Sequence, residues 1–172
     1  MDAAHFVFKA YLGFLWCFTR ILIRAPSGRK RFNVLGALNA ITQQLITVTN
    51  ETYITADSVC ELLEKIAALG SQLPITLILD NTRYQRCAKV MEKAAALQIE
   101  LLFLPPYSPN LNLIERLWRF VKKQCLYAKY YEDFTQFKHA IETCVSETDG
   151  IHKEELTSLF SLKFQSFKNF TL

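Results

Sequence analysis

Two acidic residues stand where carboxylates are well placed for metal chemistry. Asp80 directly follows the apolar run from Ile75 to Leu79, and Glu115 follows a segment rich in proline that begins at Pro105. Ligands in open α/β sheets gather at the carboxyl ends of strands, so an acid ending a strand and an acid just inside a later helix can converge. Mg²⁺ and Mn²⁺ prefer such oxygen ligands. The pair therefore indicates a possible metal site.

Each acid also has an interpretation that needs no function. Asp80 is placed to cap the next helix. Asn112 and Glu115 have the spacing of a capping box, and Glu115 stands four residues before Arg119, as in a routine helical ion pair. A third acid, Asp2, lies near the start of the chain, and its position alone does not indicate a functional role. The sequence around the acids must decide between these alternatives.

The segments that position the acids alternate between strand and helix patterns. Strand patterns occupy residues 31–38, 45–49, 75–79 and 99–104, and helix patterns occupy 56–69, 82–97, 112–128, 130–148 and a stretch from 153. The first two strands are predicted to form a hairpin. The strand–helix–strand unit over 75–104 is predicted to be parallel, with the strand 75–79 covered on both faces. The fold class is therefore α/β, a mixed sheet flanked by helices.

Composition sets broad limits on the function. The chain has 172 residues, 51% of them hydrophobic, which suits one domain with a substantial core. The net charge of +4 is compatible with a polyanionic partner. The five cysteines show no metal-binding spacing, which favours a reduced intracellular compartment. The uncharged run from Ala10 to Thr19 is too short to span a bilayer, so no membrane association is expected.

Four blocks of the sequence resemble a known family. They are Met-Asp-Ala-Ala-His at 1–5, Gly-Arg-Lys-Arg-Phe-Asn-Val-Leu-Gly-Ala at 28–37, Leu-Ile-Leu-Asp-Asn at 77–81, and Leu-Pro-Pro-Tyr-Ser-Pro-Asn-Leu-Asn-Leu-Ile-Glu-Arg-Leu-Trp at 104–118. In this order they resemble the blocks of the DDE transposases of the mariner-like and bacterial insertion-sequence superfamily. The resemblance runs from Asp2 to about Lys123. The loop before Glu115 is its most specific part.

The resemblance implies an RNase H-like catalytic domain. Residues 1–172 would form a single domain, with a core over about 1–128 and C-terminal helices over 129–172. In this family the first Asp lies on the first strand, the second follows the fourth strand, and the Glu lies on a later helix, which makes Asp2, Asp80 and Glu115 the triad. The chain begins at the first Asp, so the first strand is expected to be largely missing. The N-terminal helix-turn-helix region of the family is expected to be absent, and Leu113 stands where such loops often carry Pro.

The same resemblance implies the chemistry and the partners. Two Mg²⁺ or Mn²⁺ ions held by the triad would support cleavage at transposon ends and strand transfer into target DNA. His5 and Asn81 would orient ligands or water, with an ordinary loop hydrogen bond as the alternative. The partners implied are double-stranded DNA, a separately encoded N-terminal transposase part and further copies of the chain, in a cytoplasmic, DNA-associated setting.

Basic residues near the blocks are candidate DNA contacts, with a solvated surface as the equal alternative. They are Arg29, Lys30, Arg31, Arg116, Arg119, Lys122 and Lys123. Trp118 is expected in the core rather than stacked on a base.

Two hypotheses stay open at this point. The first is an active DDE catalytic domain. The second is an inactive, truncated transposase remnant that acts at most as a non-specific DNA-binding or interaction module. DNA affinity that depends on salt, without metal-dependent cleavage, would favour the second hypothesis.

Overall fold

The computed structural model describes residues 1–8, 18–19, 30–105, 108, 111–127 and 129–161. Most of the run from Ala10 to Thr19 lies outside these residues, as does Arg29. Among the described residues, no helix has both the length and the apolar character needed to cross a membrane.

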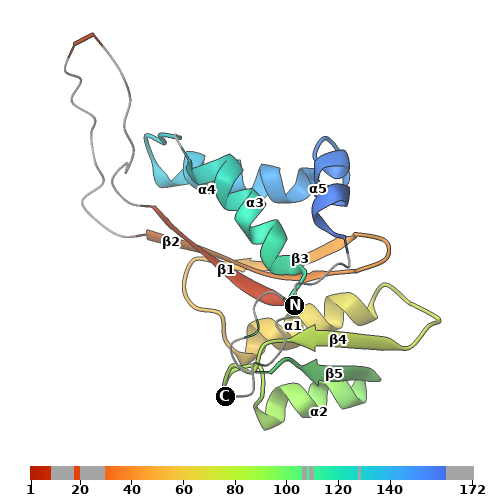
Figure 1. The fold of residues 1–172 in the computed structure, drawn as a ribbon. Coiled ribbons are helices and arrows are strands. Elements are labelled where there is room, and N and C mark those ends of the chain that lie inside the picture. The colour runs from red at the N-terminus through yellow and green to blue at the C-terminus, as the bar shows by residue number, and fades with distance from the viewer. Residues whose placement is uncertain (9–17, 20–29, 106–107, 109–110, 128, 162–172) are drawn as a thin grey trace, which may run out of the picture.

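A three-stranded antiparallel sheet forms the first half of the fold (Figure 1). Its strands, in the order in which they pair, are β1 (Asp2–Phe8), β2 (Lys30–Leu38) and β3 (Leu45–Asn50). The hairpin of β2 and β3 confirms the sequence prediction. The prediction that the first strand would be largely missing is wrong, because β1 pairs with β2 over its whole length and buries Ala4, Phe6 and Phe8.

A parallel two-stranded unit follows. It consists of α1 (Ala56–Ala67), β4 (Ile75–Leu79), α2 (Ala88–Ala96) and β5 (Ile99–Phe103). The parallel pairing of β4 and β5 confirms the predicted strand–helix–strand unit. The helix expected from Thr82 begins only at Ala88, because residues 82–87 form turns in which the Gln85 and Arg86 amides donate to the Thr82 carbonyl.

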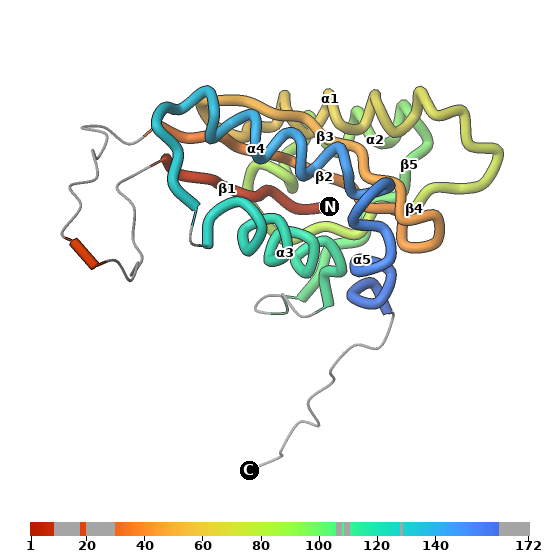
Figure 2. The backbone as a smooth tube through the Cα atoms, turned by 90° about the horizontal axis from the view of Figure 1, so that it is seen from above, coloured from red at the N-terminus to blue at the C-terminus, as the bar shows by residue number. Residues whose placement is uncertain are grey.

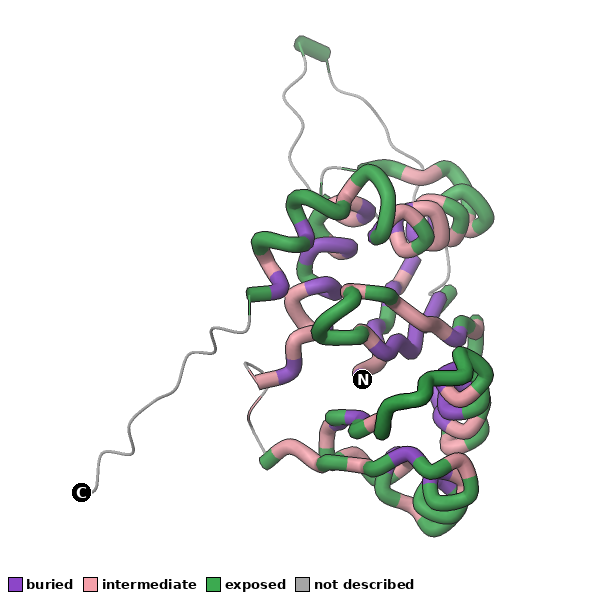
Figure 3. Tube along the Cα trace, turned by 90° about the vertical axis from the view of Figure 1, so that its right-hand side faces the viewer, coloured by how far each residue is buried: buried purple, intermediate pink, exposed green. Residues whose placement is uncertain are grey.

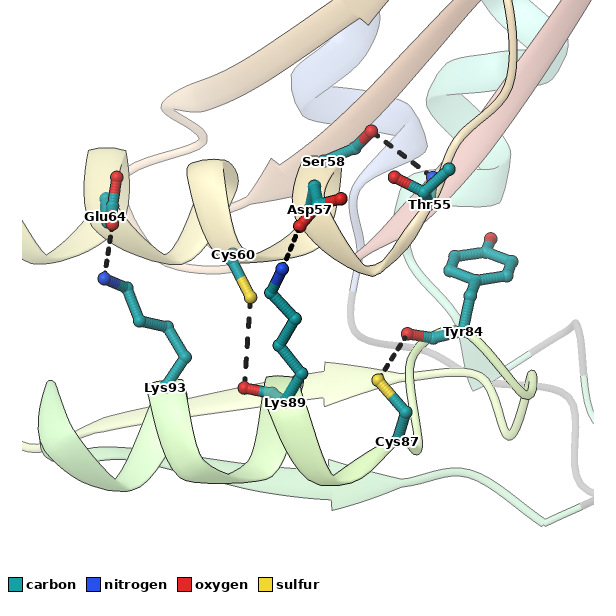
Figure 4. A network of polar contacts seen from close by, with 9 residues as sticks. All are labelled: Thr55, Asp57, Ser58, Cys60, Glu64, Tyr84, Cys87, Lys89 and Lys93. Carbon is teal, nitrogen blue, oxygen red and sulfur yellow. Dashed lines mark hydrogen bonds and ion pairs between the residues drawn. The ribbon is translucent and has the colours of Figure 1, made fainter.

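Helices α1 and α2 of this unit pack against each other. Lys89 of α2 pairs with Asp57 of α1, and Lys93 pairs with Glu64, as Figure 4 shows. These pairs lie at the surface, where solvent screens the charges, so they contribute little to stability. The two lysines lie four residues apart on one face of α2, where the pairs bridge the exposed side of the helix interface.

The strands do not form one continuous ladder. β1–β3 and β4–β5 are separate sheets, and the N-terminal amine of Met1 donates to the Ile78 carbonyl at 2.5 Å between them. The prediction that β4 is covered on both faces is wrong. Ile78 of β4 is 42% exposed and Leu102 of β5 is 51% exposed, whereas Leu77 and Leu79 are buried. Among the described elements, α1 and α2 cover only one face of this pair.

The remaining helices lie on the other side of the three-stranded sheet (Figure 2). They are α3 (Ile114–Leu126), α4 (Phe134–Ser146) and α5 (Lys153–Leu159), with a short 3₁₀ helix, η2 (Glu147–Asp149), between the last two. Alternation along β1 sends Ala4, Phe6 and Phe8 into a core with α3 and α4. Leu35 and Val48 join α1 in a second core on the opposite face.

Buried residues therefore gather in two layers, one on each side of the three-stranded sheet, with exposed helix faces outside them (Figure 3). This arrangement of helices on both faces of a sheet confirms the predicted α/β class. It also brings the start of β1, the end of β4 and the first turn of α3 toward one another.

Candidate active site

Asp2 is the first residue of β1 and is half-buried. Successive side chains of a strand point to opposite faces, so Asp2 lies on the same face as Ala4 and Phe6, which is the face covered by α3. Its partner on β2 is Gly36. The ladder with β2 therefore holds the backbone of Asp2, although the chain begins one residue earlier.

Asp80 directly follows β4 and is also half-buried. The side-chain amide of Asn112 donates to the Asp80 Oδ1 atom at 3.3 Å and to the Met1 carbonyl at 3.3 Å. Asn112 is only 4% exposed. One buried amide thus joins the end of β4, the residue next to Asp2 and the segment that leads into α3.

Glu115 lies in the first turn of α3. The capping box suggested by the sequence is not formed, because α3 has its N-cap at Leu113 and no side-chain cap hydrogen bond. The Asn112 amide donates to Asp80 and Met1. Among the described residues, no ion pair joins Glu115 to Arg119. The helix does not use the Glu115 side chain for its own structure, so that carboxylate is available to the site.

A close contact sets the position of α3 against β2. A Cβ atom built on Gly36 would lie 2.9 Å from two ring carbons of Trp118 and 3.1 Å from the Ile114 Cδ1 atom. Glycine is required here because α3 approaches the strand more closely than any larger side chain permits. Trp118 is 3% exposed, as predicted for a core residue. The contact places Glu115 near the strand position opposite Asp2.

The three carboxylates interact electrostatically. Burial, with smaller contributions from the Asp80 and Glu115 charges, raises the pKa of Asp2 from 3.8 to about 6. Burial and the Asp80 charge also raise the pKa of Glu115. The pKa of the Met1 amine is lowered to about 6 by burial, against the opposing effect of Asp2 and Asp80. The site therefore concentrates negative charge that a cation would relieve.

The described side chains do not yet form a closed set of metal ligands. Within that part of the chain, no group of three His, Cys, Asp or Glu side chains is gathered tightly enough to hold one ion. The donor chemistry fits a hard divalent cation, because all three acids offer carboxylate oxygens and the Asp80 charge adds to the rise in the pKa of both Asp2 and Glu115. The structure thus brings the three acids into one region, but not close enough together to coordinate a single ion.

The two residues expected to orient ligands have other partners. His5 is exposed and its Nδ1 atom lies 2.7 Å from the Asn33 Oδ1 atom, on the face of β1 opposite Asp2. The Asn81 Oδ1 atom accepts a hydrogen bond of 3.0 Å from Arg86. For Asn81 the structure therefore shows the loop hydrogen bond that the sequence analysis held as an alternative.

The described candidate DNA contacts differ in their surroundings. Lys30 lies over the ring of Phe134, and Arg31 is exposed at the same end of β2. On α3, Arg116 donates to the carbonyls of Leu159 and Ser161 at 2.8 and 2.6 Å. The three later basic residues of α3 lie nearer solvent; Arg119 and Lys123 are exposed, and Lys122 is half-buried.

The loop after Asp80 contributes polar groups that sequence reasoning missed. The Thr82 hydroxyl and both amide atoms of Gln85 are buried without a hydrogen-bond partner among the described residues. Burial raises the pKa of the nearby Tyr84, and the Asp2 and Asp80 charges add to this effect. Asn112 was also missed as a site residue. Its place three residues before Glu115 was the available signal, but the same spacing suggests a helix cap.

The described elements form the RNase H-like α/β fold that the resemblance implied. A chain in the cryo-EM structure of the simian T-cell lymphotropic virus intasome in complex with PP2A regulatory subunit B56 gamma has a similar fold, with a TM-score of 0.59 and 17% sequence identity. The match covers 99% of this chain and 58% of that chain, so this chain spans little more than half of the similar chain.

The family follows from the sequence. The model of the DDE superfamily endonuclease family matches residues 19–138, which is more than half of the chain. The chain belongs to the DDE superfamily of endonucleases, as the resemblance of its sequence blocks predicted. The matched range includes Asp80 and Glu115 and begins after Asp2. No curated protein matches the chain.

Proposed function

We propose that this chain is the catalytic domain of a DDE transposase, which cleaves DNA with the help of divalent metal ions and transfers the cut strand into target DNA. The single domain would comprise a core over about 1–128 and C-terminal helices over 129–172. The observation that carries the proposal is that Asp2, Asp80 and Glu115 come from three separate elements, and that the Asp80 charge adds to the rise in the pKa of both Asp2 and Glu115.

The proposed metal ligands are these three acids. Mg²⁺ or Mn²⁺, two ions in the complete site, would supply activation of the attacking hydroxyl and stabilisation of the leaving oxygen at phosphorus. Asn112 would hold the Asp80 carboxylate toward the start of β1 through its two hydrogen bonds. Half-burial of all three acids would limit the water around them and strengthen their hold on a cation.

The partners follow from the same proposal. The substrates would be double-stranded DNA at transposon ends and at the target, in an intracellular, cytoplasmic setting. The active form would be a homo-oligomer, completed by a separately encoded N-terminal transposase part that recognises the ends. Lys30, Arg31 and the basic residues of α3 would contact phosphates, and the same role is proposed for Arg29, outside the described residues.

The test is metal-dependent nicking of DNA that carries the element's own ends. The parent chain, alone and with the N-terminal part, is expected to nick such DNA with Mg²⁺ or Mn²⁺ and to be inactive in EDTA. Asp80→Asn and Glu115→Gln should abolish nicking, whereas Asn81→Ala, which changes an exposed loop residue, should not. Equal activity of the parent and the Asp80→Asn variant would rule the proposal out.

A second candidate is an inactive remnant that binds DNA without cleaving it. Two observations favour it: the acids are not closed around one point, and β1 and β4 form no shared ladder among the described residues. This candidate predicts DNA affinity that falls with salt and no nicking with any metal, even when the N-terminal part is added. The nicking experiment therefore separates the two candidates.

A further inference from the structure

The turn that follows Asp80 holds polar groups whose hydrogen-bonding capacity is unused. Gln85 is 0% exposed, and neither the oxygen nor the nitrogen of its side-chain amide has a partner among the described residues. The buried Thr82 hydroxyl is in the same state. Leaving a buried polar group unpaired costs free energy, so native proteins keep few of them without a reason. Three such atoms in one turn beside a candidate active site indicate a role beyond folding.

The turn keeps its shape through contacts that do not involve these side-chain atoms. The backbone amides of Gln85 and Arg86 both donate to the Thr82 carbonyl at 3.1 Å. The Arg86 guanidinium lies over the ring of Phe103, 5.5 Å from its centroid, at the end of β5. The turn is therefore fixed against the ends of both parallel strands. The Gln85 amide and the Thr82 hydroxyl remain available for another purpose.

Tyr84 lies between these two residues in the turn. Its side chain is half-buried and packs against the core that includes Met1 and Leu79. These two residues directly precede Asp2 and Asp80. Figure 4 shows the Tyr84 ring directed away from α2. A tyrosine has an apolar ring and a polar tip, so the core anchors the ring while the hydroxyl serves the polar side.

The electrostatic surroundings of the Tyr84 hydroxyl agree with this placement. Burial raises the pKa of Tyr84, and the Asp2 and Asp80 charges add to the rise. The Thr82 and Gln85 side chains act in the opposite direction, so they lie beside the phenol, but without the geometry of a hydrogen bond. The hydroxyl therefore stays protonated at neutral pH, where it is a neutral hydrogen-bond donor.

We propose that the Tyr84 hydroxyl donates a hydrogen bond to the reacting DNA phosphate at Asp2 and Asp80. Gln85 positions this hydroxyl, because its side-chain amide can donate to the phenol oxygen while the phenol proton points to the phosphate. The inference rests on the proposed function, since it takes a DNA phosphate as the ligand. Negative charge develops on the phosphate oxygens during the reaction, and a donor already in place stabilises that charge without reorganisation.

The first test is steady-state nicking by Tyr84→Phe, which removes only the hydroxyl. The kcat should fall about a hundredfold, as for the loss of one transition-state donor. The KM for DNA and the Mg²⁺ concentration for half-maximal rate should change less than twofold. The matched control is Tyr131→Phe, which removes another half-buried hydroxyl, one that donates to the Cys125 carbonyl at 2.8 Å in the core of α3 and α4. This control should keep the parent's kcat.

Gln85→Met separates positioning from folding. The variant keeps the length of the side chain and removes both unpaired atoms, so its Tm should equal or exceed that of the parent. Its kcat should nevertheless fall about tenfold. The double variant Tyr84→Phe/Gln85→Met should be no slower than Tyr84→Phe, because Gln85 acts through the phenol. A lower Tm with an unchanged kcat in the folded variant would assign Gln85 a structural role and overturn its positioning role.

A measurement without cleavage tests the contact itself. The protein is labelled with 3-fluorotyrosine and carries Glu115→Gln, which leaves DNA uncut under the proposed function. Fluorine NMR identifies the Tyr84 signal as the one lost in Tyr84→Phe. Addition of a DNA duplex with the element's ends, in the presence of Mg²⁺, should shift the Tyr84 signal and leave the Tyr131 signal in place.

The two measurements separate this inference from the proposed function. If the parent nicks DNA and Tyr84→Phe nicks it at the same rate, the inference fails alone. A Tyr84 signal that does not move when DNA is added also overturns the inference, whatever the nicking rate. If no metal supports nicking by the parent but the Tyr84 signal shifts with DNA, the proposed function fails and the contact between Tyr84 and DNA stands.

Discussion

The Asn112 side-chain amide donates to a carboxylate oxygen of Asp80 at 3.3 Å, and the same amide donates to the carbonyl of Met1. Asn112 immediately precedes the turn into α3, so this buried residue ties the helix of Glu115 to the other two acids. An asparagine is suited to the position because its neutral amide donates to a carboxylate without adding charge. We infer that Asn112 positions the site rather than capping the helix.

Removal of this amide should cost both stability and activity. Asn112→Ala leaves the Met1 carbonyl and part of Asp80 without a donor, so the free energy of unfolding should fall by about 1–3 kcal/mol. Asn112→Asp should destabilise more at neutral pH, because it adds a carboxylate beside Asp80. Urea denaturation measures both effects. The control Asn81→Ala removes an exposed loop hydrogen bond to Arg86 and should change stability by less than about 0.5 kcal/mol.

The kinetic pattern distinguishes positioning from folding. If Asn112 positions Asp80, Asn112→Ala should nick DNA more slowly under conditions where it is still fully folded, and it should require more metal for half-maximal rate. Normal metal dependence in folded Asn112→Ala would contradict this role.

Gly36 is predicted to be intolerant of any side chain. A methyl group there meets the Trp118 ring at 2.9 Å, so Gly36→Ala should lower the free energy of unfolding by about 1–3 kcal/mol through overpacking. Gly150→Ala is the matched control, since its added Cβ has its nearest neighbour at an ordinary 3.6 Å. Urea denaturation of both variants provides the comparison.

A double-mutant cycle locates the cause of the Gly36 effect. Trp118→Phe removes the ring carbons that the new methyl group meets, so the double variant should lose less stability than the sum of the single variants. Simple additivity would mean that Trp118 is not the neighbour responsible.

Local patterns predicted the elements of the fold well. The strand pattern at 75–79 matches β4 residue for residue, and the hairpin pattern matches β2 and β3, because alternation and β-branched content are local properties. The start of α2 was placed six residues early, since the turn formed by the Thr82 carbonyl depends on hydrogen bonds that composition does not reveal. The tertiary environment also decided how much of β4 is covered.

The site was predictable only as far as its acids. Asp80 and Glu115 stand in motifs that the sequence shows. The sequence around Asn112, however, is equally compatible with a role for Asn112 as a helix cap. Its true partners, Met1 and Asp80, are distant in the chain, so only the packing of α3 against the strands selects them. The same limit applies to Gly36. Only glycine fits there because the Trp118 ring, on another element, fills the space that a side chain would occupy.

Stability without metal should fall as the pH rises from about 4 to about 6. The folded state raises the pKa of Asp2 from 3.8 to about 6, so it binds more protons than the unfolded state across this window. The stabilising contribution is complete below the unfolded pKa and is lost as pH rises through the folded pKa. After allowance for the exposed part of the side chain, the loss should be on the order of 1–2 kcal/mol.

Asp2→Asn tests the assignment of this pH dependence. The variant should be more stable than the parent at pH 7 without metal, and it should lack the decline between pH 4 and 6. The Met1 amine acts in a separate window: its lowered pKa should make stability rise between about pH 6 and 8 in both proteins. A decline that persists unchanged in Asp2→Asn would assign the effect to another group.

A bound divalent metal should offset the repulsion between the three carboxylates and so raise the free energy of unfolding. Mg²⁺ or Mn²⁺ favours ionised carboxylates, so a metal at one hundred times its Kd should stabilise the folded chain by about 2.7 kcal/mol. Thermal unfolding at pH 7 measures the gain, with matched ionic strength in a monovalent salt as the control. Asp80→Asn and Glu115→Gln should lose most of the gain, whereas Lys89→Ala/Lys93→Ala should keep it, because those lysines lie on the α1–α2 surface away from the acids. An equal rise in Tm for the parent and both acid variants would mean that the metal acts elsewhere on the protein.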